Sequence, residues 1–172
     1  MIVRRGEIRD VAALIDLNAH VHQPHVDEHP DLFRPTTERS GIEEYFTSIL
    51  TDLAHYVLVA EMESRPVGYL AAQVQRRGAN AFSKRHDRLY VHQVSVDPQF
   101  RRRGVGRALF AEIERTARSE SLTEVALDTW AFNQDAQRFF EALGFSVFNV
   151  RMWKRGVSSQ AEYPKSPIEL SD

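Results

Sequence analysis

One stretch decides the fold: Val94-Ser95-Val96-Asp97-Pro98-Gln99-Phe100-Arg101-Arg102-Arg103-Gly104-Val105-Gly106-Arg107. Its β-rich start predicts a strand that ends at Asp97-Pro98, and the apolar spacing after Gly104 predicts a helix. The first turn of a helix has free backbone N–H groups and the positive end of a dipole. Glycines let an anion approach those groups, and three successive arginines add positive charge. The pattern predicts a pyrophosphate site.

The spacing of these glycines separates the stretch from two better-known phosphate loops. It lacks the G-x-x-x-x-G-K-[ST] pattern of a P-loop and the G-x-G-x-x-G pattern of a dinucleotide site. A purely structural helix start remains the alternative, with glycines for close packing and arginines on a solvated face.

Composition bounds the remaining choices. The chain has 172 residues, 42% of them hydrophobic and 27% charged, which suits one globular domain. Its net charge of −2 disfavours a nucleic-acid partner. The absence of cysteine excludes disulfides, thiolate metal sites and a cysteine nucleophile. No apolar run has the length of a membrane span, and the N-terminus does not resemble a signal peptide, so we expect a cytoplasmic protein without a membrane partner.

The order of elements predicts an α/β fold. Helices are expected near residues 11–18 and over 38–53, 104–119 and 133–143, the last ended by Gly144. Residues 75–88 are polar and read as an exposed loop. The strands are expected at residues 2–5, 56–60, 67–74, 89–96, 124–129 and 145–153. These elements predict a single domain over residues 1–156, with helices on both faces of one mixed sheet, and a polar tail over 157–172.

At this point the chain resembles the GNAT superfamily of N-acetyltransferases. That family carries R/Q-x-x-G-x-G/A between its fourth strand and third helix, and this sequence has Arg101-x-x-Gly104-x-Gly106 after Val96-Asp97-Pro98. The family also often has an Asn followed by a helix that ends F-Y-E-K-L-G-F. Here Asn133 precedes Phe139-Phe140-Glu141-Ala142-Leu143-Gly144-Phe145. The resemblance implies a GNAT-like domain with six to seven strands, about four helices, and a sheet that splays between strands 4 and 5.

The resemblance also implies acetyl-CoA as co-substrate and a set of residues that hold it. The edge of the strand at Val94, Ser95 and Val96 would pair with the pantetheine arm, and the thioester carbonyl would face a backbone N–H of Val94 or Val96. Asn133 would meet the pantetheine or its neighbouring backbone, and Phe140 stands where the family commonly has a tyrosine. The expected pyrophosphate site comprises Arg101, Arg102, Arg103, Gly104, Val105, Gly106 and Arg107.

Two side chains are candidates for proton transfer. An imidazole titrates near neutral pH, so His92 is the candidate base that deprotonates the amine, with a sheet histidine bonded to backbone as the alternative. His92 would share a face with Tyr90 and Val94 unless a bulge intervenes. Phe140 has no proton to give to the leaving thiolate. Tyr90 could substitute, the thiolate could leave unassisted, or the protein could bind acyl-CoA and catalyse poorly.

The resulting functional prediction is an acetyl-CoA-dependent N-acyltransferase that acts on a primary amine of a small molecule by direct attack. A protein N-terminus or lysine is the alternative acceptor, and a catalytically weak acyl-CoA-binding regulatory module is the alternative from another class. No metal is expected, because the histidines at positions 20, 22, 25 and 29 lack a recognised ligand spacing. That histidine-rich region either borders the acceptor pocket or is a solvated loop. A homodimer is possible within the family.

Overall fold

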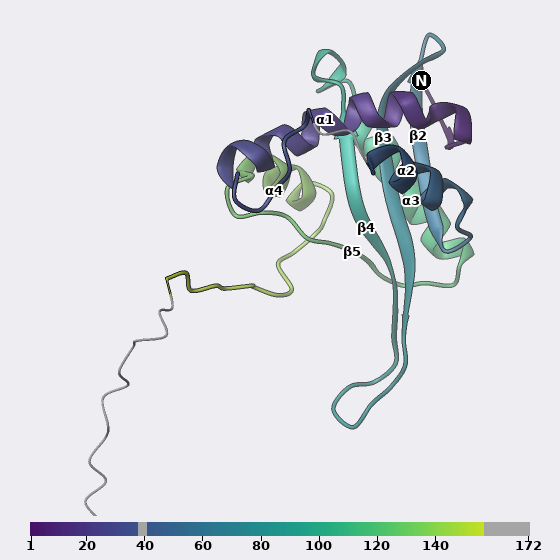
Figure 1. Cartoon of the computed structure of the whole chain (residues 1–172). Helices are drawn as coiled ribbons and strands as arrows, with labels where there is room; N and C mark the ends of the chain where they lie inside the picture. Colours follow the sequence, from purple (N-terminus) through teal and green to yellow (C-terminus); the bar gives the residue numbers. More distant parts are fainter. Residues whose placement is uncertain (38–40, 157–172) are drawn as a thin grey trace, which may run out of the picture.

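The computed structural model describes residues 1–37 and 41–156. They fold around one mixed sheet (Figure 1). Its strand order is β1-β2-β3-β4-β5. The first four strands pair antiparallel, and β5 pairs parallel with β4. The strands are β1 (Ile2–Arg5), β2 (His55–Met62), β3 (Arg65–Arg77), β4 (His86–Val96) and β5 (Val125–Leu127).

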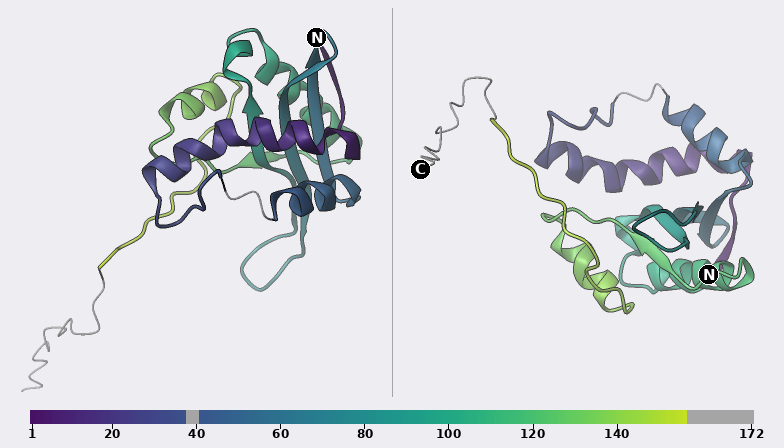
Figure 2. Two further views of the ribbon diagram at one scale, coloured as in Figure 1. Left: turned by 45° about the horizontal axis from the view of Figure 1, so that its top comes forward. Right: turned by 90° about the horizontal axis from the view of Figure 1, so that it is seen from below.

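Helices cover both faces of the sheet, as the element order predicts (Figure 2). One face carries α1 (Val11–Glu28) and α2 (Ile42–Thr51), and the other carries α3 (Val105–Ser119) and α4 (Gln134–Glu141). Two short 3-10 helices complete the set. The first, η1 (Ile8–Asp10), leads into α1, and the second, η2 (Pro98–Phe100), leads into the loop before α3. No helix within residues 1–37 and 41–156 is both long and apolar enough to cross a membrane.

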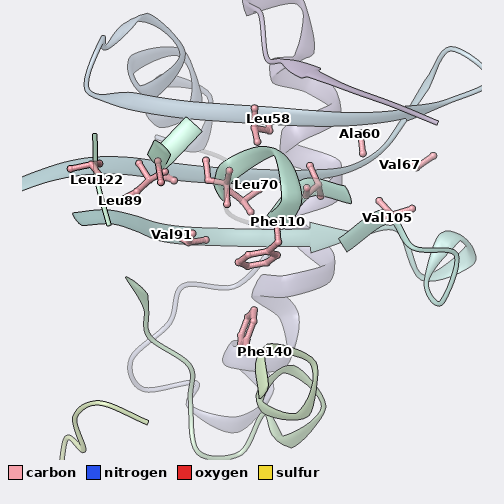
Figure 3. Packing of buried hydrophobic residues seen from close by; sticks show 14 residues of the cluster. Leu58, Ala60, Val67, Leu70, Leu89, Val91, Val105, Phe110, Leu122 and Phe140 are labelled. Atoms are coloured by element: carbon pink, nitrogen blue, oxygen red, sulfur yellow. The ribbon is translucent and has the colours of Figure 1, made fainter. Parts of the chain in front are cut away.

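Alternation along the strands divides the core into two clusters. Leu58 and Leu70 face α3, whereas their neighbours Val59 and Tyr69 face α1 and α2. In the α3-side cluster, Phe110 lies between the sheet and Phe140 of α4 (Figure 3). Burial of large side chains on both faces is the main source of stability for such a layered fold.

The predicted number of strands is wrong for the described residues, which form five strands rather than six or seven. Residues 145–153, expected as a strand, are extended but pair with no strand that the structure describes. A β-rich pattern gives a segment the capacity to pair, but only a neighbouring strand edge turns it into part of a sheet. The predicted tail, 157–172, lies outside the described residues.

Several predicted boundaries also differ. Helix α1 runs to Glu28 rather than ending near residue 18, and β5 spans only Val125–Leu127 of the expected 124–129. The second helix begins at Ile42, and residues 38–40 of its predicted span lie outside the described residues. Strands β3 and β4 extend into the predicted loop 75–88 through the pairs Gln75↔Arg88 and Arg77↔His86. Polar residues hold this extension, since the Arg88 Nε donates to Gln75 Oε1 across 3.0 Å.

Candidate active site

The start of α3 leaves backbone donors free. Gly104 is its N-cap with φ of 81°, a left-handed conformation that side chains with a Cβ rarely adopt. A Cβ at this position would meet nothing within 4 Å, so the reason for glycine is conformational, and open space lies next to it. The N–H of Ala108 donates to Gly104 O across 3.0 Å and forms the first hydrogen bond of the helix. The N–H groups of residues 105–107 precede it and have no acceptor within the helix.

Gly106 has a different role, which is packing. A Cβ built there would lie 2.8 Å from Cζ of Phe139, closer than real Cβ contacts. The absence of a side chain therefore lets α3 approach α4 closely. Val105 between the two glycines is buried in the α3-side cluster, so only its backbone is available to a ligand.

The arginines beside the helix start are exposed, and two of them are held in place. The Arg101 Nε donates to Val96 O across 3.2 Å, and the Arg103 guanidinium lies 5.3 Å from the ring centre of Phe100. Arg102 has φ of 61°, a second left-handed residue in the same loop. Arg101, Arg102, Arg103 and Arg107 thus surround the free N–H groups with positive charge.

Strand β4 carries a bulge at His92. Ala72 pairs with Val91 and Ala71 with Gln93, so His92 is an extra residue in the ladder. Pairing of β4 with β5 extends only to Val91↔Leu127, which leaves the following edge of β4 without a strand partner among the described residues. This is the place at which the sheet was expected to splay.

The N–H groups of Val94 and Val96 point to that open edge. The Asp97 N–H donates to Val67 O on the β3 side across 2.9 Å, and successive N–H groups of a strand alternate between its two edges. Before the bulge, the Leu89 N–H donates to Glu124 O on the β5 side. The bulge shifts the alternation by one residue, so Val94 and Val96 continue on the β5 side.

The bulge also places neighbouring side chains on one face. His92 contacts Gln73, and Gln93 accepts a 2.9 Å hydrogen bond from the Tyr69 hydroxyl, both on the α1 and α2 side of the sheet. Val94 packs against the α3-side cluster instead. His92 therefore shares a face with Tyr90 but not with Val94. The bulge at His92 is the cause, and it is the exception that the sequence analysis names.

The surroundings of His92 favour its neutral form. Burial, together with the neighbouring His55, lowers the pKa of His92 below its ordinary value of 6.5. The two imidazoles lie 6.1 Å apart. The His92 Nε2 is 3.3 Å from Gln73 Oε1, a contact that favours the tautomer with the proton on Nε2 and a lone pair on Nδ1.

Tyr90 lies beside His92, with ring centres 5.0 Å apart. Burial and then the Asp128 carboxylate raise the pKa of Tyr90 to about 12. The phenol therefore keeps its proton throughout the neutral range, with the Asp128 carboxylate as the hydrogen-bond partner of its O–H.

Three other predicted site residues have structural contacts. The Ser95 hydroxyl is buried and donates to Leu17 O across 2.6 Å, which ties β4 to α1. The Asn133 side chain caps α4 by accepting from the Ala136 N–H across 3.2 Å. Phe140 is buried, with its ring centre 5.7 Å from that of Phe110, so it packs as expected of a phenylalanine at that position.

A pocket of about 270 Å³ opens on the α1 and α2 side, next to the bulge. At one wall, Asn18 donates to the Tyr69 hydroxyl across 2.8 Å, and that hydroxyl donates to Gln93. Most of the remaining lining is apolar or aromatic, and Arg34 is the one Arg, Lys, Asp or Glu among the lining residues that the structure describes. The lining residues are Asn18, His22, Leu32, Phe33, Arg34, Pro35, Gly41, Ile42, Tyr45, Phe46 and Gln93.

Apart from His22, sequence reasoning missed these pocket residues, because they come from α1, the following loop, α2 and β4. The only local signal was the polar pair His92-Gln93 inside an otherwise apolar strand end. The histidine-rich region is not a loop over most of its length, because α1 runs through it to Glu28, and it borders the pocket through His22.

Comparison with known proteins identifies the family. A sequence profile for the acetyltransferase (GNAT) family matches residues 20–145. The chain belongs to this family. Human N-acetyltransferase 8B is 30% identical over 122 residues, which cover 68% of this chain and 51% of that protein. N-acetyltransferase MJ1207 of Methanocaldococcus jannaschii, uncharacterized, is 31% identical over 102 residues, 58% of this chain and 43% of its own. The chain thus spans about half the length of these curated relatives.

Solved structures establish the GNAT fold. A tetramutant of the BH1408 protein from Bacillus halodurans superposes with a TM-score of 0.85 at 24% identity, covering 90% of this chain and 99% of that one. The aminoglycoside N-acetyltransferase AAC(6')-Iy, in complex with CoA, gives a TM-score of 0.71 at 20% identity, covering 91% and 95%.

Beyond the pocket, this GNAT chain gathers aromatic rings around its histidines. His25 and His29 pack against Trp130 at ring distances of 6.0 and 5.1 Å, and Phe33 lies 5.3 Å from Trp130. Burial lowers the pKa of His25, which favours its neutral form. Over residues 1–37 and 41–156, no group of three or more His, Asp or Glu side chains is arranged to hold a metal.

Proposed function

We propose that this protein transfers an acetyl group from acetyl-CoA to a primary amine of a small molecule by direct attack. The observation that carries the proposal is the open edge of β4, with the N–H groups of Val94 and Val96 directed to it, beside the free N–H groups at the start of α3. When bound, acetyl-CoA supplies the thioester carbonyl and a thiolate leaving group.

The residues present fit such a group. Space next to Gly104, together with exposed arginines on both sides of it, suits a pyrophosphate. The pantetheine arm carries amides, which can pair with the edge of Val94, Ser95 and Val96 in the manner of an added strand. An N–H of Val94 or Val96 would then stabilise the oxyanion as a preorganised donor. Asn133 and Phe140 contribute by fixing α4 beside this edge.

His92 would deprotonate the attacking amine. A base must be neutral to accept a proton, and the lowered pKa of His92 keeps its imidazole neutral at pH 7. With Nε2 bonded to Gln73, the free Nδ1 lone pair is the accepting atom.

Tyr90 would stabilise the leaving thiolate by turning its O–H from the Asp128 carboxylate toward the sulfur, as a hydrogen-bond donor rather than by complete proton transfer. A thiol has a pKa of about 8.5, well below that of this phenol, so the proton stays on Tyr90. Phe140 supplies no proton, which leaves Tyr90 as the candidate donor near His92.

The pocket favours an amine with an apolar body and an anionic group. Its apolar rings suit a hydrophobic or aryl side chain, and the Arg34 guanidinium has no ion-pair partner within residues 1–37 and 41–156. No Asp or Glu belongs to its described lining, which disfavours a polycation such as an aminoglycoside. Phenylalanine and phenylethylamine are therefore an informative pair, since they differ only in the carboxylate.

The test follows free thiol released from acetyl-CoA, to which this cysteine-free chain contributes no background. We expect turnover with phenylalanine above phenylethylamine, and above an aminoglycoside. Loss of one charge-assisted hydrogen bond is worth about 1.5–3 kcal/mol, so Arg34→Gln should raise KM for phenylalanine about 10- to 100-fold. KM for phenylethylamine should change less than about 2-fold.

The outcomes separate two failures. Turnover that prefers the aminoglycoside, or an Arg34→Gln effect equal on both amines, would refute the acceptor class and leave acetyl transfer intact. Acetyl-CoA binding without turnover of any amine in a broad panel would refute the enzymatic proposal and favour a binding module.

A further inference from the structure

A hydrogen-bond network of three side chains forms one wall of the pocket on the α1 and α2 side. Asn18 from α1, Tyr69 from β3 and Gln93 from β4 meet there. The Asn18 Nδ2 donates to the Tyr69 hydroxyl across 2.8 Å, and that hydroxyl donates to Gln93 Oε1 across 2.9 Å. The Asn18 Nδ2 also donates to the same Oε1 across 3.4 Å. Three elements of the fold therefore converge on one amide.

Tyr69 holds this network in place. Its side chain is fully buried, and its ring packs against that of Phe46 with ring centres 5.7 Å apart. Burial raises the pKa of Tyr69 well above its ordinary value, so the hydroxyl keeps its proton and remains a donor. Because the hydroxyl accepts from Asn18, its single proton is directed at Gln93.

The network fixes which end of the Gln93 amide faces it. Oε1 accepts from both Tyr69 and Asn18, and a carbonyl oxygen has two lone pairs, so this end of the amide is occupied. The opposite orientation would place the NH2 group of Gln93 against that of Asn18, and two donors would face each other. The Nε2 of Gln93 therefore points away from the network with both of its N–H groups available.

This Nε2 is open to a ligand in the pocket. No residue that the structure describes accepts a hydrogen bond from it. Within residues 1–37 and 41–156, Asp87 Oδ1 is the one side-chain N or O atom that is fully buried without a partner, so solvent reaches Gln93 Nε2. Gln93 lines the pocket of about 270 Å³. In a pocket with mostly apolar walls, such single polar groups set specificity.

Gln93 also lies beside the proposed base. It follows His92 directly at the bulge, and both side chains lie on the α1 and α2 side of the sheet. Consecutive Cα atoms are about 3.8 Å apart, so one small molecule can reach both side chains. A group that binds Gln93 therefore lies close to the amine that His92 would deprotonate. Since an N–H donor binds an oxygen, that group is a carbonyl or a carboxylate.

We propose that Gln93 determines specificity, because its Nε2 donates to a carbonyl or carboxylate oxygen next to the amine of the acceptor, and that Tyr69 and Asn18 position it. This inference rests on the proposed acetyl transfer, since it assigns a contact within the same acceptor site. Gln93 differs from Arg34 in what it selects. A guanidinium favours an anion, whereas a neutral amide N–H donates to charged and uncharged oxygens. The acceptor is then an α-amino acid or its amide.

Three compounds separate these contacts: phenylalanine, phenylalaninamide and phenylethylamine. The first two carry an oxygen next to the amine-bearing carbon, and the third carries none. Gln93→Glu keeps an acceptor for Tyr69 and Asn18 but removes the N–H donors, and Gln93→Met removes both functions at similar length. Gln75→Glu is the matched control, because Gln75 is also a half-buried glutamine whose Oε1 accepts a hydrogen bond, and it lies outside the described lining of the pocket.

Each compound is titrated calorimetrically into the full-length protein with CoA present, which has no acetyl group to transfer. The measurement is made at about pH 8, where a glutamate side chain is ionised. Gln93→Met should weaken phenylalaninamide binding about 2- to 12-fold, the value of one neutral hydrogen bond. Gln93→Glu should weaken phenylalanine binding by about 10-fold or more, because two carboxylates then face each other. Both variants should affect phenylethylamine least, and Gln75→Glu should bind all three compounds as wild type does.

Tyr69→Phe tests the positioning role. Without the hydroxyl, the Gln93 amide is free to rotate, so the preference for phenylalaninamide over phenylethylamine should fall. Gln93→Met should also cost less phenylalaninamide affinity in the Tyr69→Phe background than in the wild-type background. A merely structural role of Tyr69 would weaken both compounds alike and leave the effect of Gln93→Met unchanged.

Thiol release from acetyl-CoA, measured in parallel, separates this proposal from acetyl transfer itself. Selective binding without turnover would refute acetyl transfer and support the Gln93 contact. Turnover combined with equal losses for all three compounds in the Gln93 variants would refute the Gln93 contact and leave acetyl transfer intact. Unchanged binding in both Gln93 variants, or no binding of any compound by wild type, would also overturn the assignment.

Discussion

Gly106→Ala tests the packing that fixes α4 against the start of α3. The added methyl would lie 2.8 Å from Phe139 Cζ and 3.4 Å from its Cε2, and the ring cannot retreat freely because it lies 5.8 Å from Phe110 and 5.5 Å from Phe140. Overpacking of this kind costs about 1–3 kcal/mol. Alanine also has a helix propensity about 1 kcal/mol better than glycine, which hides part of that cost.

A double-mutant cycle with Phe139→Leu removes this ambiguity, since the propensity gain is the same in both backgrounds. Urea unfolding of the four proteins gives the free energy of unfolding for each. The cost of Gly106→Ala should be about 1–3 kcal/mol smaller in the Phe139→Leu background than in the wild-type background. A coupling energy below about 0.5 kcal/mol would show that Gly106 is not required by this contact, and the packing argument would fail.

Three further predictions concern β4. His92→Gln should lower kcat about 100- to 10,000-fold with acetyl-CoA affinity unchanged, whereas His86→Gln on the same strand should have no effect. Equal losses of kcat in the two variants would refute the assignment of His92 as the base. A base must be unprotonated, so kcat/KM should fall with decreasing pH through a midpoint below 6.5. His55→Gln should move that midpoint upward, because it removes one cause of the lowered pKa of His92. A midpoint that stays fixed argues against His92. Ser95→Ala leaves Leu17 O without its buried donor and should reduce the free energy of unfolding by about 1–3 kcal/mol in chemical denaturation, so an unchanged value would contradict the role of that hydrogen bond.

Local chemistry explains what the sequence could predict. The end of β4 and the start of α3 depend on neighbours in the chain, on Pro98 and on Gly104, so the sequence alone places both. The helical face of α3 follows from apolar spacing alone. Asn133, by contrast, is expected from the sequence to meet the pantetheine, and the structure shows instead that its side chain caps α4.

Long-range geometry explains what the sequence could not predict. The bulge at His92 is a mismatch with β3, so nothing in β4 alone reveals it. Arg34 and Gln93 meet at one pocket only after α1 and α2 pack on the sheet. Residues 145–153 have the composition of a strand, but pairing requires an edge in the right place, which composition does not encode.

The most direct test of the central claim is calorimetric titration of acetyl-CoA into wild-type protein, Gly104→Asp and Gly144→Asp. Both glycines are left-handed, at φ of 81° and 92°, and a Cβ meets nothing at either, so the two variants suffer similar backbone strain. Only Gly104→Asp places a negative charge at the start of α3. We predict binding by wild type and by Gly144→Asp, and its loss in Gly104→Asp. Absence of binding by folded wild type, or equal binding by all three proteins, would contradict the account.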